Sequence, residues 1–342
     1  MIDGFLIIIK GEITIMISVV IATYNGEKYI EEQLDSIKNQ SIKPDEVIIR
    51  DDKSSDSTPK IVREYIKKNN LNNWNFEVNE ENKGYKKNFY DLLKIAKGNF
   101  IFLSDQDDVW VNEKIRYTMD EFSNNPQVLA LNTGIQLVDE KLNKIIVEPK
   151  KNFYNANFLY SEKKLEKLTF FKFEDLLRGN MSPGCSMCIT AELRDKFVES
   201  YNFVLAHDWY MNFLASLDGG CAFFNKNLVK YRIHRGNAIG LSSKDDIRSK
   251  LLALHKDNQL RIRRTRELFE TFQNISKNYT FDSQTEKNLR QYFKVRISFM
   301  EQPSLRNILR LRKLSNYYKL TTKRARLWDL IIAMHIDNLL VR

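Results

Sequence analysis

The sequence has few cysteines and no long hydrophobic run. Three cysteines, Cys185, Cys188 and Cys221, are too few for a disulfide framework and fit a reducing compartment. Cys185 and Cys188 have C-x-x-C spacing, but no second pair completes a zinc site, so we expect buried thiols. No apolar stretch reaches the roughly 18 residues of a membrane-spanning helix. These absences argue against a disulfide-stapled fold and against a membrane span within this sequence.

Three motifs of common α/β enzymes are also missing. The sequence has no Walker loop for nucleotide phosphates, no G-x-G-x-x-G fingerprint and no nucleophile elbow. Where a nucleotidyltransferase would have a glycine-rich loop and a lysine, the first predicted strand is followed by Tyr24-Asn25-Gly26-Glu27. A nucleotidyltransferase therefore remains only an alternative.

The 342 residues are 43% hydrophobic and 12% aromatic, enough for one large globular domain and an appendage. The net charge of +10 is uneven, because residues 244–342 hold 22 Lys and Arg against 10 Asp and Glu. This basic tail carries +12 and leaves −2 for the rest. Such a distribution favours contact between the tail and an anionic surface, either a membrane or a nucleic acid.

The first hundred residues alternate between strand and helix patterns. The predicted strands are Ile17–Thr23, Glu46–Arg50, Trp74–Val78 and Phe100–Leu103. Between them lie amphipathic helical patterns, the first with Ile30, Leu34 and Ile37 on one face. This order predicts an α/β fold with a mostly parallel sheet flanked by helices.

Local residues predict where the helices begin and end. Thr58 and Pro59 are expected as the N-cap and first-turn proline of the second helix. A third helix is predicted over residues 85–97, with Gly98 as its stop signal, and a fourth from near Asn112.

Polar residues follow three of these strands, at residues 23–25, 51–56 and 105–108. Ligands bind parallel sheets at the carboxyl ends of the strands, so we expect these loops to meet in one crevice. The third loop lies in FLSDQDDVW, residues 102–110, and its carboxylates at i and i+2 suit a hard divalent cation that also contacts phosphate. The alternative is an acidic turn that caps the following helix.

Residues 17–240 resemble the large inverting family 2 of nucleotide-sugar glycosyltransferases, which have the GT-A fold. The resemblance rests on SVVIATYN at residues 18–25 and on FLSDQDDVW. The latter looks like the family's D-x-D motif in the form common among bacterial rhamnosyltransferase-like members. The resemblance implies a transferase that depends on Mg²⁺ or Mn²⁺ and uses a dTDP- or UDP-sugar.

The resemblance assigns a nucleotide pocket to Thr23, Tyr24, Asn25, Asp52, Asn82, Gly84 and Asp105. Asp52 would accept the N3–H of the base, which suits the imide of uracil or thymine. Plain turn chemistry is the alternative for Asp51, Asp52 and Gly84.

By the same resemblance Asp107, Asp105 and His234 would hold the metal ion, while Asp108 shapes the loop. A structural histidine is the alternative for His234. Arg235 follows it where some relatives have glycine, and this change points to phosphate binding or an altered loop.

Asp208 in Ala206-His207-Asp208-Trp209 stands where the family has its catalytic base. It would take the proton of the acceptor hydroxyl as the anomeric carbon is attacked. The alternative is a helix N-cap, and we expect the helix N-terminus to lower the pKa of Asp208. An acceptor side is assigned by resemblance to Gly184, Cys185, His207, Trp209 and Trp110. For Trp209, anchoring in the core is the alternative, and for the loop with Gly184 and Cys185 it is an ordinary connection.

The tail is rich in basic helical segments, with a break predicted at Pro303. Its last helix has an apolar stripe from Trp328 to Leu340 after Lys323, Arg324 and Arg326. This pattern indicates an interfacial anchor on an anionic membrane, or equally a face that packs on the enzyme itself or on a second copy in a homodimer.

We therefore predict an N-terminal extension over residues 1–15, with Met16 a candidate natural start, a GT-A domain over 16–240 and a helical tail over 241–342. The predicted function is transfer of a sugar, first L-rhamnose from dTDP-L-rhamnose and otherwise a hexose from a UDP-sugar, to a glycan or lipid-linked acceptor of a bacterial cell-surface polysaccharide. We expect a cytoplasmic enzyme at the inner face of the plasma membrane. Alternatives are an inactive scaffold and a nucleic-acid-binding protein, although an acidic crevice would repel phosphate without metal.

Overall fold

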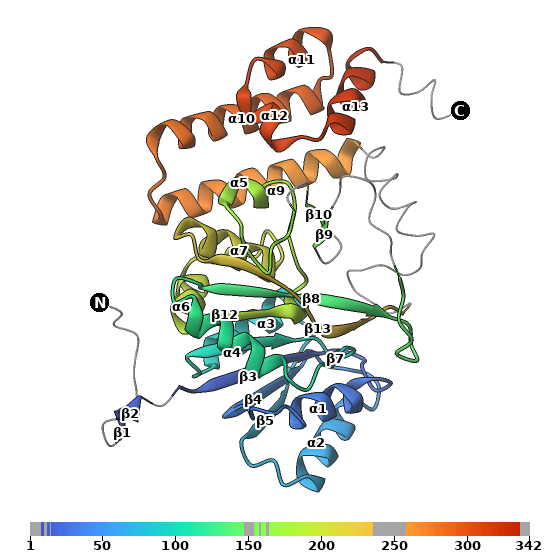
Figure 1. Ribbon diagram of the computed structural model, residues 1–342. Coiled ribbons are helices and arrows are strands. Elements are labelled where there is room, and N and C mark those ends of the chain that lie inside the picture. The colour runs from blue at the N-terminus through green and yellow to red at the C-terminus, as the bar shows by residue number, and fades with distance from the viewer. Residues whose placement is uncertain are drawn as a thin grey trace. The chain divides into compact units, whose positions relative to one another are not determined.

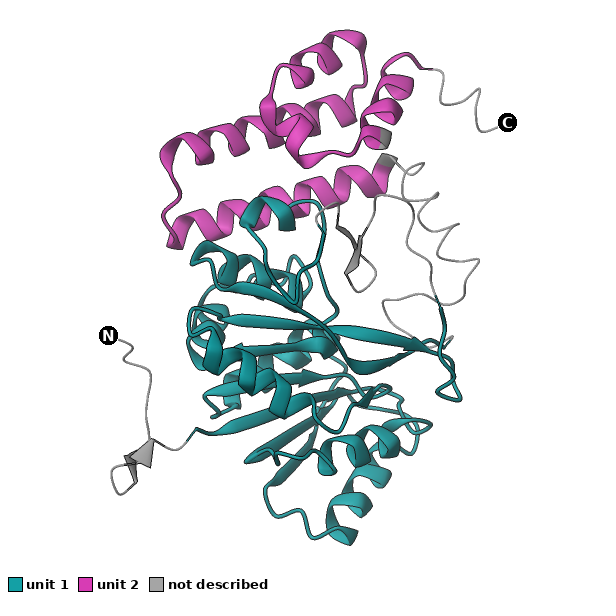
Figure 2. Ribbon diagram, in the orientation of Figure 1, with its two compact units in different colours: residues 1–234 teal, residues 235–342 magenta. Residues whose placement is uncertain are grey.

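The computed structural model describes residues 8–9, 12–13, 15–146, 154–156, 159–161, 164–234 and 258–335. The chain divides into two compact units, residues 1–234 and 235–342, which are teal and magenta in Figure 2. The predicted boundary at residue 240, the loop around Arg235 and the last residues of the predicted terminal helix lie outside the described residues.

The first unit has the predicted α/β class, with helices flanking a nine-stranded sheet (Figure 1). The strands of this sheet are β3 (Ile17–Thr23), β4 (Glu46–Asp51), β5 (Trp74–Val78), β6 (Phe100–Ser104), β7 (Val109–Trp110), β8 (Ala130–Val138), β11 (Leu168–Phe170), β12 (Met187–Thr190) and β13 (Cys221–Arg232). Two separate strand pairs are β1 (Ile8–Ile9) with β2 (Glu12–Ile13) and β9 (Tyr154–Ala156) with β10 (Leu159–Ser161). The helices are α1 (Ile30–Lys38), α2 (Thr58–Lys68), α3 (Tyr85–Ile95), α4 (Lys114–Asn124), α5 (Phe173–Leu176), α6 (Ala191–Ser200) and α7 (His207–Leu217), with a 3₁₀ turn at Gly184–Ser186.

The sheet is mixed, with the strand order β11-β13-β8-β12-β6-β3-β4-β5 and β7 paired to β13. β6, β3, β4 and β5 run parallel, as the alternating pattern predicts. β12 enters antiparallel between β6 and β8, while β8 and β13 run parallel to each other. A short apolar run such as Met187–Thr190 looks the same in either direction, so the sequence could not reveal this insertion.

β3 has the bounds that its β-branched run predicts, and Val19, Val20 and Ile21 are fully buried. A strand covered on both faces needs apolar side chains at successive positions, and this requirement explains its lack of alternation. β5 also has its predicted bounds.

Two predicted helix ends are wrong, the N-cap of α2 and the C-terminal end of α3. α2 begins at Thr58 itself with Ser57 as N-cap, and the Thr58 hydroxyl instead accepts a hydrogen bond from the Gly26 amide at 2.7 Å. α3 ends at Ile95, before Gly98. A Cβ at Gly98 would lie 2.6 Å from the backbone nitrogen of Ser18, so this glycine is needed for close approach. The fourth helix, α4, begins at residue 114 because residues 112–113 form a turn.

The second unit is helical where it is described. It contains α9 (Asn258–Asn278), α10 (Ser283–Glu301), α11 (Leu305–Arg312), α12 (Ser315–Leu320) and α13 (Lys323–Ala333). α10 packs against both α9 and α11, and the predicted break at Pro303 is confirmed between α10 and α11. No helix among the described residues combines the length and the apolar composition that crossing a bilayer would demand.

Candidate active site

The parallel strands β3, β4 and β6 bring three loops to one edge of the sheet. In the register Thr23 lies beside Asp51, and Ile21 lies beside Ser104. Hydrogen bonds then join the loops, because the Asp52 amide donates to the Thr23 carbonyl at 2.8 Å. The polar residues that follow these strands therefore lie together, as the strand order requires.

Gln106 fixes the loop after β3, a role that the sequence did not reveal. Its Oε1 accepts from the Tyr24 amide at 2.7 Å, and its Nε2 donates to the Tyr24 carbonyl at 2.8 Å. Gly26 lies so close that a Cβ there would clash with the Gln106 side chain. The Tyr24 side chain is left half-exposed beside the acidic loop.

Thr23 and Asn25 hold neighbouring loops in place. The buried Thr23 hydroxyl donates to Asp51 at 2.8 Å, and Asn25 adopts a φ of 50°. The Asn25 Oδ1 accepts from the Ser55 amide at 2.8 Å, so its side chain bridges the loops after β3 and β4. A nucleotide contact for either residue stays a prediction.

Asp52 is buried and organises the loop before α3. Its Oδ1 accepts from the Asn79 side chain and the Lys83 amide, while Oδ2 accepts from the Gly84 amide at 2.7 Å. The space beside the Gly84 Cα is open, so its φ of 77°, in the left-handed region, is the reason that glycine is favoured there. Oδ2 of Asp52 accepts fewer bonds than Oδ1 and keeps a lone pair for a further donor. The exposed Asn82 accepts from the Gly84 amide at 3.2 Å.

The end of β6 gathers carboxylates at unusual pKa values. Burial raises the pKa of Asp105 to about 7, and the negative charges of Asp107 and Asp208 contribute to this rise. Burial, with the charges of Asp107 and Asp105, holds the pKa of Asp108 well above its usual range. These carboxylates are thus close enough to repel one another, a situation that a cation would relieve.

Two buried cations support this acidic loop from within. Lys114, at the start of α4, donates to the Cys185 carbonyl at 2.8 Å, and burial lowers its pKa to about 8. The Arg232 amide donates to Asp108 Oδ1 at 3.1 Å, and its Nε donates to the Asp107 carbonyl at 2.8 Å. These bonds fix the loop backbone, and the charge of Lys114 offsets part of the rise in the pKa of Asp105.

His234 lies just past β13 and contacts Asp107, with 2.9 Å between Nε2 and Oδ2. Its ring also packs on Tyr29, with centroids 4.8 Å apart. Among the described residues, Asp105, Asp108 and Cys185 form a further group whose potential ligand atoms lie within 4.8 Å of one another. Burial holds the pKa of the Cys185 thiol well above its usual range, so it stays protonated and is a poor ligand for a hard cation. The oxygen-rich set around Asp105 and Asp107 fits Mg²⁺ or Mn²⁺ better.

Asp208 lies in the first turn of α7, whose N-cap is Ala206, so the N-cap alternative is wrong. Asp208 Oδ1 accepts from the Trp209 amide at 2.8 Å, and Oδ2 accepts from the Asn180 side chain at 2.9 Å. The expected lowering of its pKa is also wrong, because burial outweighs the helix N-terminus and raises the pKa to about 6. A carboxylate with this pKa is still mostly ionised at neutral pH and is a stronger base than an exposed one.

The residues assigned to the acceptor side are mostly buried. Cys185 and Trp110 lie inside the unit, and the Lys114 ammonium lies 3.8 Å from the centre of the Trp110 ring. His207 is stacked on Phe89 at 4.1 Å, and burial lowers its pKa to about 3, so it is neutral. Contact of these side chains with an acceptor stays a prediction.

Two further residues of this set are fixed by packing. A Cβ at Gly184 would lie 2.9 Å from His207 Nε2, so a glycine permits this approach. Trp209 Nε1 donates to the Leu176 carbonyl at 3.0 Å, and the ring stacks on Phe213. These two contacts support the alternative that Trp209 anchors α7 in the core, and its contact with a sugar stays a prediction.

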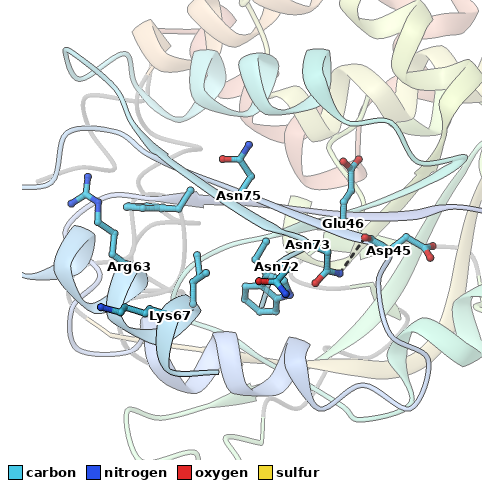
Figure 3. Close-up of a pocket in the computed structure, with 10 residues that line it drawn as sticks. Asp45, Glu46, Arg63, Lys67, Asn72, Asn73 and Asn75 are labelled. Carbon is cyan, nitrogen blue, oxygen red and sulfur yellow. Dashed lines mark hydrogen bonds between the residues drawn. The ribbon is translucent and has the colours of Figure 1, made fainter. Parts of the chain in front are cut away.

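A pocket of about 570 Å³ lies away from these residues, at the amino ends of β4 and β5 (Figure 3). Figure 3 shows Arg63 and Lys67 of α2 on one side, and Asp45 and Glu46 on the other. The Asn73 side chain donates to the Asp45 carbonyl at 3.1 Å. This pocket is at the sheet edge opposite the acidic loop and takes no part in the candidate site.

Comparisons with known proteins agree with this geometry. Residues 18–181 match the model of the family described as Glycosyl transferase family 2. The chain is 28% identical over 249 residues to "dTDP-rhamnosyl transferase RfbG" of Shigella flexneri, a match that covers 70% of this chain and 80% of the relative.

Solved structures share the fold at low sequence identity. TarS 1–349 of S. aureus in complex with UDP-GlcNAc superposes with a TM-score of 0.55 and 19% identity, over 91% of this chain and 82% of that one. The mannosyltransferase PcManGT from Pyrobaculum calidifontis in complex with GDP-Man and Mn²⁺ superposes with a TM-score of 0.51 and 16% identity, over 95% and 87%. Together with the acidic strand-end site, these matches lead to one conclusion: residues 18–181 are similar to glycosyl transferase family 2, the fold is GT-A-like, and the protein is a glycosyltransferase.

Proposed function

We propose that this glycosyltransferase is metal-dependent and inverting, and that it uses a pyrimidine nucleoside diphosphate sugar. The first choice of donor is dTDP-L-rhamnose, supported by the name of the Shigella relative, and a UDP-hexose is the second. The acceptor would be a glycan or lipid-linked sugar of a bacterial cell surface, reached at the inner face of the plasma membrane.

One observation carries the proposal: a Cβ at Gly184 would lie 3.5 Å from Asp208 Cβ, and the next residue, Cys185, has its thiol within 4.8 Å of carboxylate oxygens of Asp105 and Asp108. This closeness supports a site in which the candidate base acts beside the carboxylates that suit a divalent cation. Asp105, Asp107 and His234 would hold Mg²⁺ or Mn²⁺, and the bound ion would neutralise charge on the leaving diphosphate.

In this proposal Asp208 accepts the proton of the acceptor hydroxyl. The hydroxyl oxygen bonds to the anomeric carbon as the bond from that carbon to the diphosphate oxygen breaks, and the configuration inverts. Asn180 and the Trp209 amide orient the carboxylate through the bonds to its two oxygens. No covalent sugar–enzyme intermediate is required.

Asp52 would select the base. Its Oδ2 accepts one bond from Gly84 and has room for the N3–H donor of uracil or thymine. The loops held by Gln106 and Asn25 would present Thr23, Tyr24 and Asn25 to the nucleotide, with Asn82 and Gly84 on the opposite loop.

The test is donor turnover. Purified protein is incubated with dTDP-, UDP- and GDP-sugars in Mn²⁺, Mg²⁺ or chelator, and nucleoside diphosphate release is measured together with donor binding by calorimetry. We expect metal-dependent turnover of one pyrimidine donor. Asp107→Asn should lose metal-dependent donor binding, whereas Asp208→Asn should keep binding and lose transfer by about 10²–10⁴-fold.

Asp120→Asn, on the exposed face of α4, is the matched control and should behave like the wild type. Equal turnover with chelator, or unchanged transfer in Asp208→Asn, would contradict the assigned roles. Failure of every donor to bind in the presence of metal would remove the transferase proposal for these substrates.

A further inference from the structure

The segment from residue 302 to residue 335 has a one-sided charge. It contains eight basic residues: Arg306, Arg310, Arg312, Lys313, Lys319, Lys323, Arg324 and Arg326. Its one acidic residue, Asp329, is fully buried and accepts bonds from Arg261, Arg296 and the Tyr317 hydroxyl. This part of the second unit therefore presents positive charge to solvent without any exposed carboxylate of its own.

The same segment exposes large aliphatic side chains. Leu305, Leu309 and Leu327 are 55%, 59% and 60% exposed. In α11 the inward positions are already filled by Ile308 and Leu311, which are almost fully buried. The core of the unit is thus filled without Leu305 and Leu309, and a row of exposed leucines on one helix indicates an interaction surface.

Leucines and arginines lie in adjacent rows on α11. Leu305 and Leu309 are four residues apart and lie on one face of the helix, and Arg306 and Arg310 repeat with the same spacing beside them. Leu327 of α13 and Met334, the C-cap residue of the same helix, are seven residues apart, and Met334 is 42% exposed. The four α11 residues Leu305, Arg306, Leu309 and Arg310 are termed the basic–leucine surface.

We propose that the basic–leucine surface binds an anionic lipid bilayer, lying flat in the headgroup region. Arginines would meet the anionic headgroups while the neighbouring leucines enter the acyl boundary below them. A nucleic acid would use the charges through its phosphates but would gain little from Leu305 and Leu309, since the bases of a single strand stack on aromatic side chains. The combination of charge and exposed leucine therefore favours a lipid surface.

This inference differs from the sequence-based prediction in its residues. The sequence pointed to the stripe from Trp328 to Leu340, but in the described part of α13 Ile332 and Ala333 are buried. The exposed aliphatic residues of this segment are Leu305 and Leu309 of α11, Leu327 of α13 and Met334. The inference is independent of the proposed sugar transfer, because vesicle binding and donor turnover are measured separately.

The experiment is flotation of the full-length protein with vesicles of phosphatidylcholine alone or of phosphatidylcholine with phosphatidylglycerol. We expect binding only to the anionic vesicles, and a loss of binding when salt is raised from about 0.1 M to 1 M, as the Debye length falls. Arg306→Glu/Arg310→Glu and Leu305→Gln/Leu309→Gln should each weaken partitioning by about tenfold or more.

Matched controls separate this surface from general charge and hydrophobicity. Arg263→Glu/Arg266→Glu makes the same charge change at exposed positions of α9, and Ile42→Gln/Ile146→Gln removes two exposed aliphatic residues from the first unit. Both should bind vesicles like the wild type. Circular dichroism checks that each variant is folded.

Three results would overturn the proposal. The first is equal binding to neutral and anionic vesicles, or none to either. The second is tight binding of a fluorescent oligonucleotide that the α11 arginine variant loses and the leucine variant keeps, which would assign the surface to nucleic acid. The third is a change of oligomeric state in the leucine variant without a change in vesicle binding, measured by sedimentation velocity, which would assign it to a contact between copies of the chain.

Discussion

Asp329 in the second unit and Asp208 in the first are both buried, yet their pKa values move in opposite directions. Burial raises the pKa of Asp208 to about 6, and its hydrogen-bond donors are neutral amides. At Asp329 burial would also raise the pKa, but the charges of Arg296 and Arg261 outweigh it and lower the pKa. The difference lies in the partners, since both carboxylates are out of water.

A buried carboxylate paired with arginines has a structural role, whereas a buried carboxylate among other carboxylates is typical of a functional site. Asp329 is paired with two guanidinium groups and a hydroxyl, so its charge is balanced within the unit. The pKa of Asp105 is raised by burial first and then by the neighbouring charges of Asp107 and Asp208, so its charge is not balanced in the same way. Perturbed carboxylates of the second kind mark functional sites more often than those of the first kind.

Asp329→Asn should give the largest effect on stability. It leaves Arg261 and Arg296 buried without a counter-charge, and breaking such a pair costs about 3–5 kcal/mol of the free energy of unfolding. Because its folded pKa is lowered, the contribution of Asp329 is present above the unfolded pKa of about 3.9 and is lost as pH falls through the folded pKa. Hydrogen exchange of α10 and α13 amides in urea measures the second unit separately.

Glu301→Gln is the matched control for this prediction. Glu301 pairs with Arg266 in the same unit, but both side chains are more than one third exposed. A surface pair of this kind contributes less than about 1 kcal/mol. Equal losses in the two variants would contradict the claim that Asp329 is the central ion-pair partner of the unit.

The sequence predicted the parallel half of the sheet because each strand there is a short run with its own local signal, such as Ile17–Thr23. It could not predict β12, whose place depends on pairing with β6 and β8 from distant parts of the chain. The predicted direction of the pKa shift of Asp208 was wrong for a related reason. Closeness to a helix N-terminus is visible in sequence, whereas burial is a property of the folded unit.

The same distinction explains which candidate-site residues were found. The aspartates of FLSDQDDVW stand out because like charges are concentrated there, whereas Gln106 gave no separate signal. Its partner, Tyr24, is 82 residues away along the chain. Asn180 likewise contacts Asp208 across 28 residues. Local composition can locate a cluster of charges, but the neutral side chains that orient it require the fold.

Asp105→Asn should change stability with the opposite sign to Asp329→Asn. The folded pKa of Asp105 is raised to about 7, so its ionisation destabilises the metal-free fold as pH rises through that value. At pH 8 in chelator we expect the variant to be more stable than the wild type by on the order of 1–2 kcal/mol, a modest gain because water screens a partly exposed carboxylate. Near pH 4 the free energies of unfolding of the variant and the wild type should become equal. Urea unfolding at both pH values measures this.

Two comparisons sharpen the Asp105 prediction. Asp139→Asn, at an exposed loop where bonds from Asn143 lower the pKa, should give a small loss and no gain. Added Mn²⁺ should stabilise the wild type more than Asp105→Asn, since a ligand that binds only the folded state raises its stability. A loss of stability in Asp105→Asn at pH 8 without metal would show that its charge is compensated after all.

Asn180→Ala should give the smallest effect, a shift in the pH dependence of transfer. Asn180 donates to Asp208 and so opposes the rise in pKa that burial causes. Without this bond the pKa of Asp208 should rise further, and the acid limb of kcat/KM should move to higher pH by less than about one unit. Asn132 belongs to the same buried amide network, but its side chain donates to Asn212 and not to Asp208. Asn132→Ala should therefore leave the acid limb of kcat/KM at the wild-type pH. An unmoved limb in Asn180→Ala, with reduced activity at every pH, would reduce Asn180 to a packing role and detach the pKa of Asp208 from catalysis.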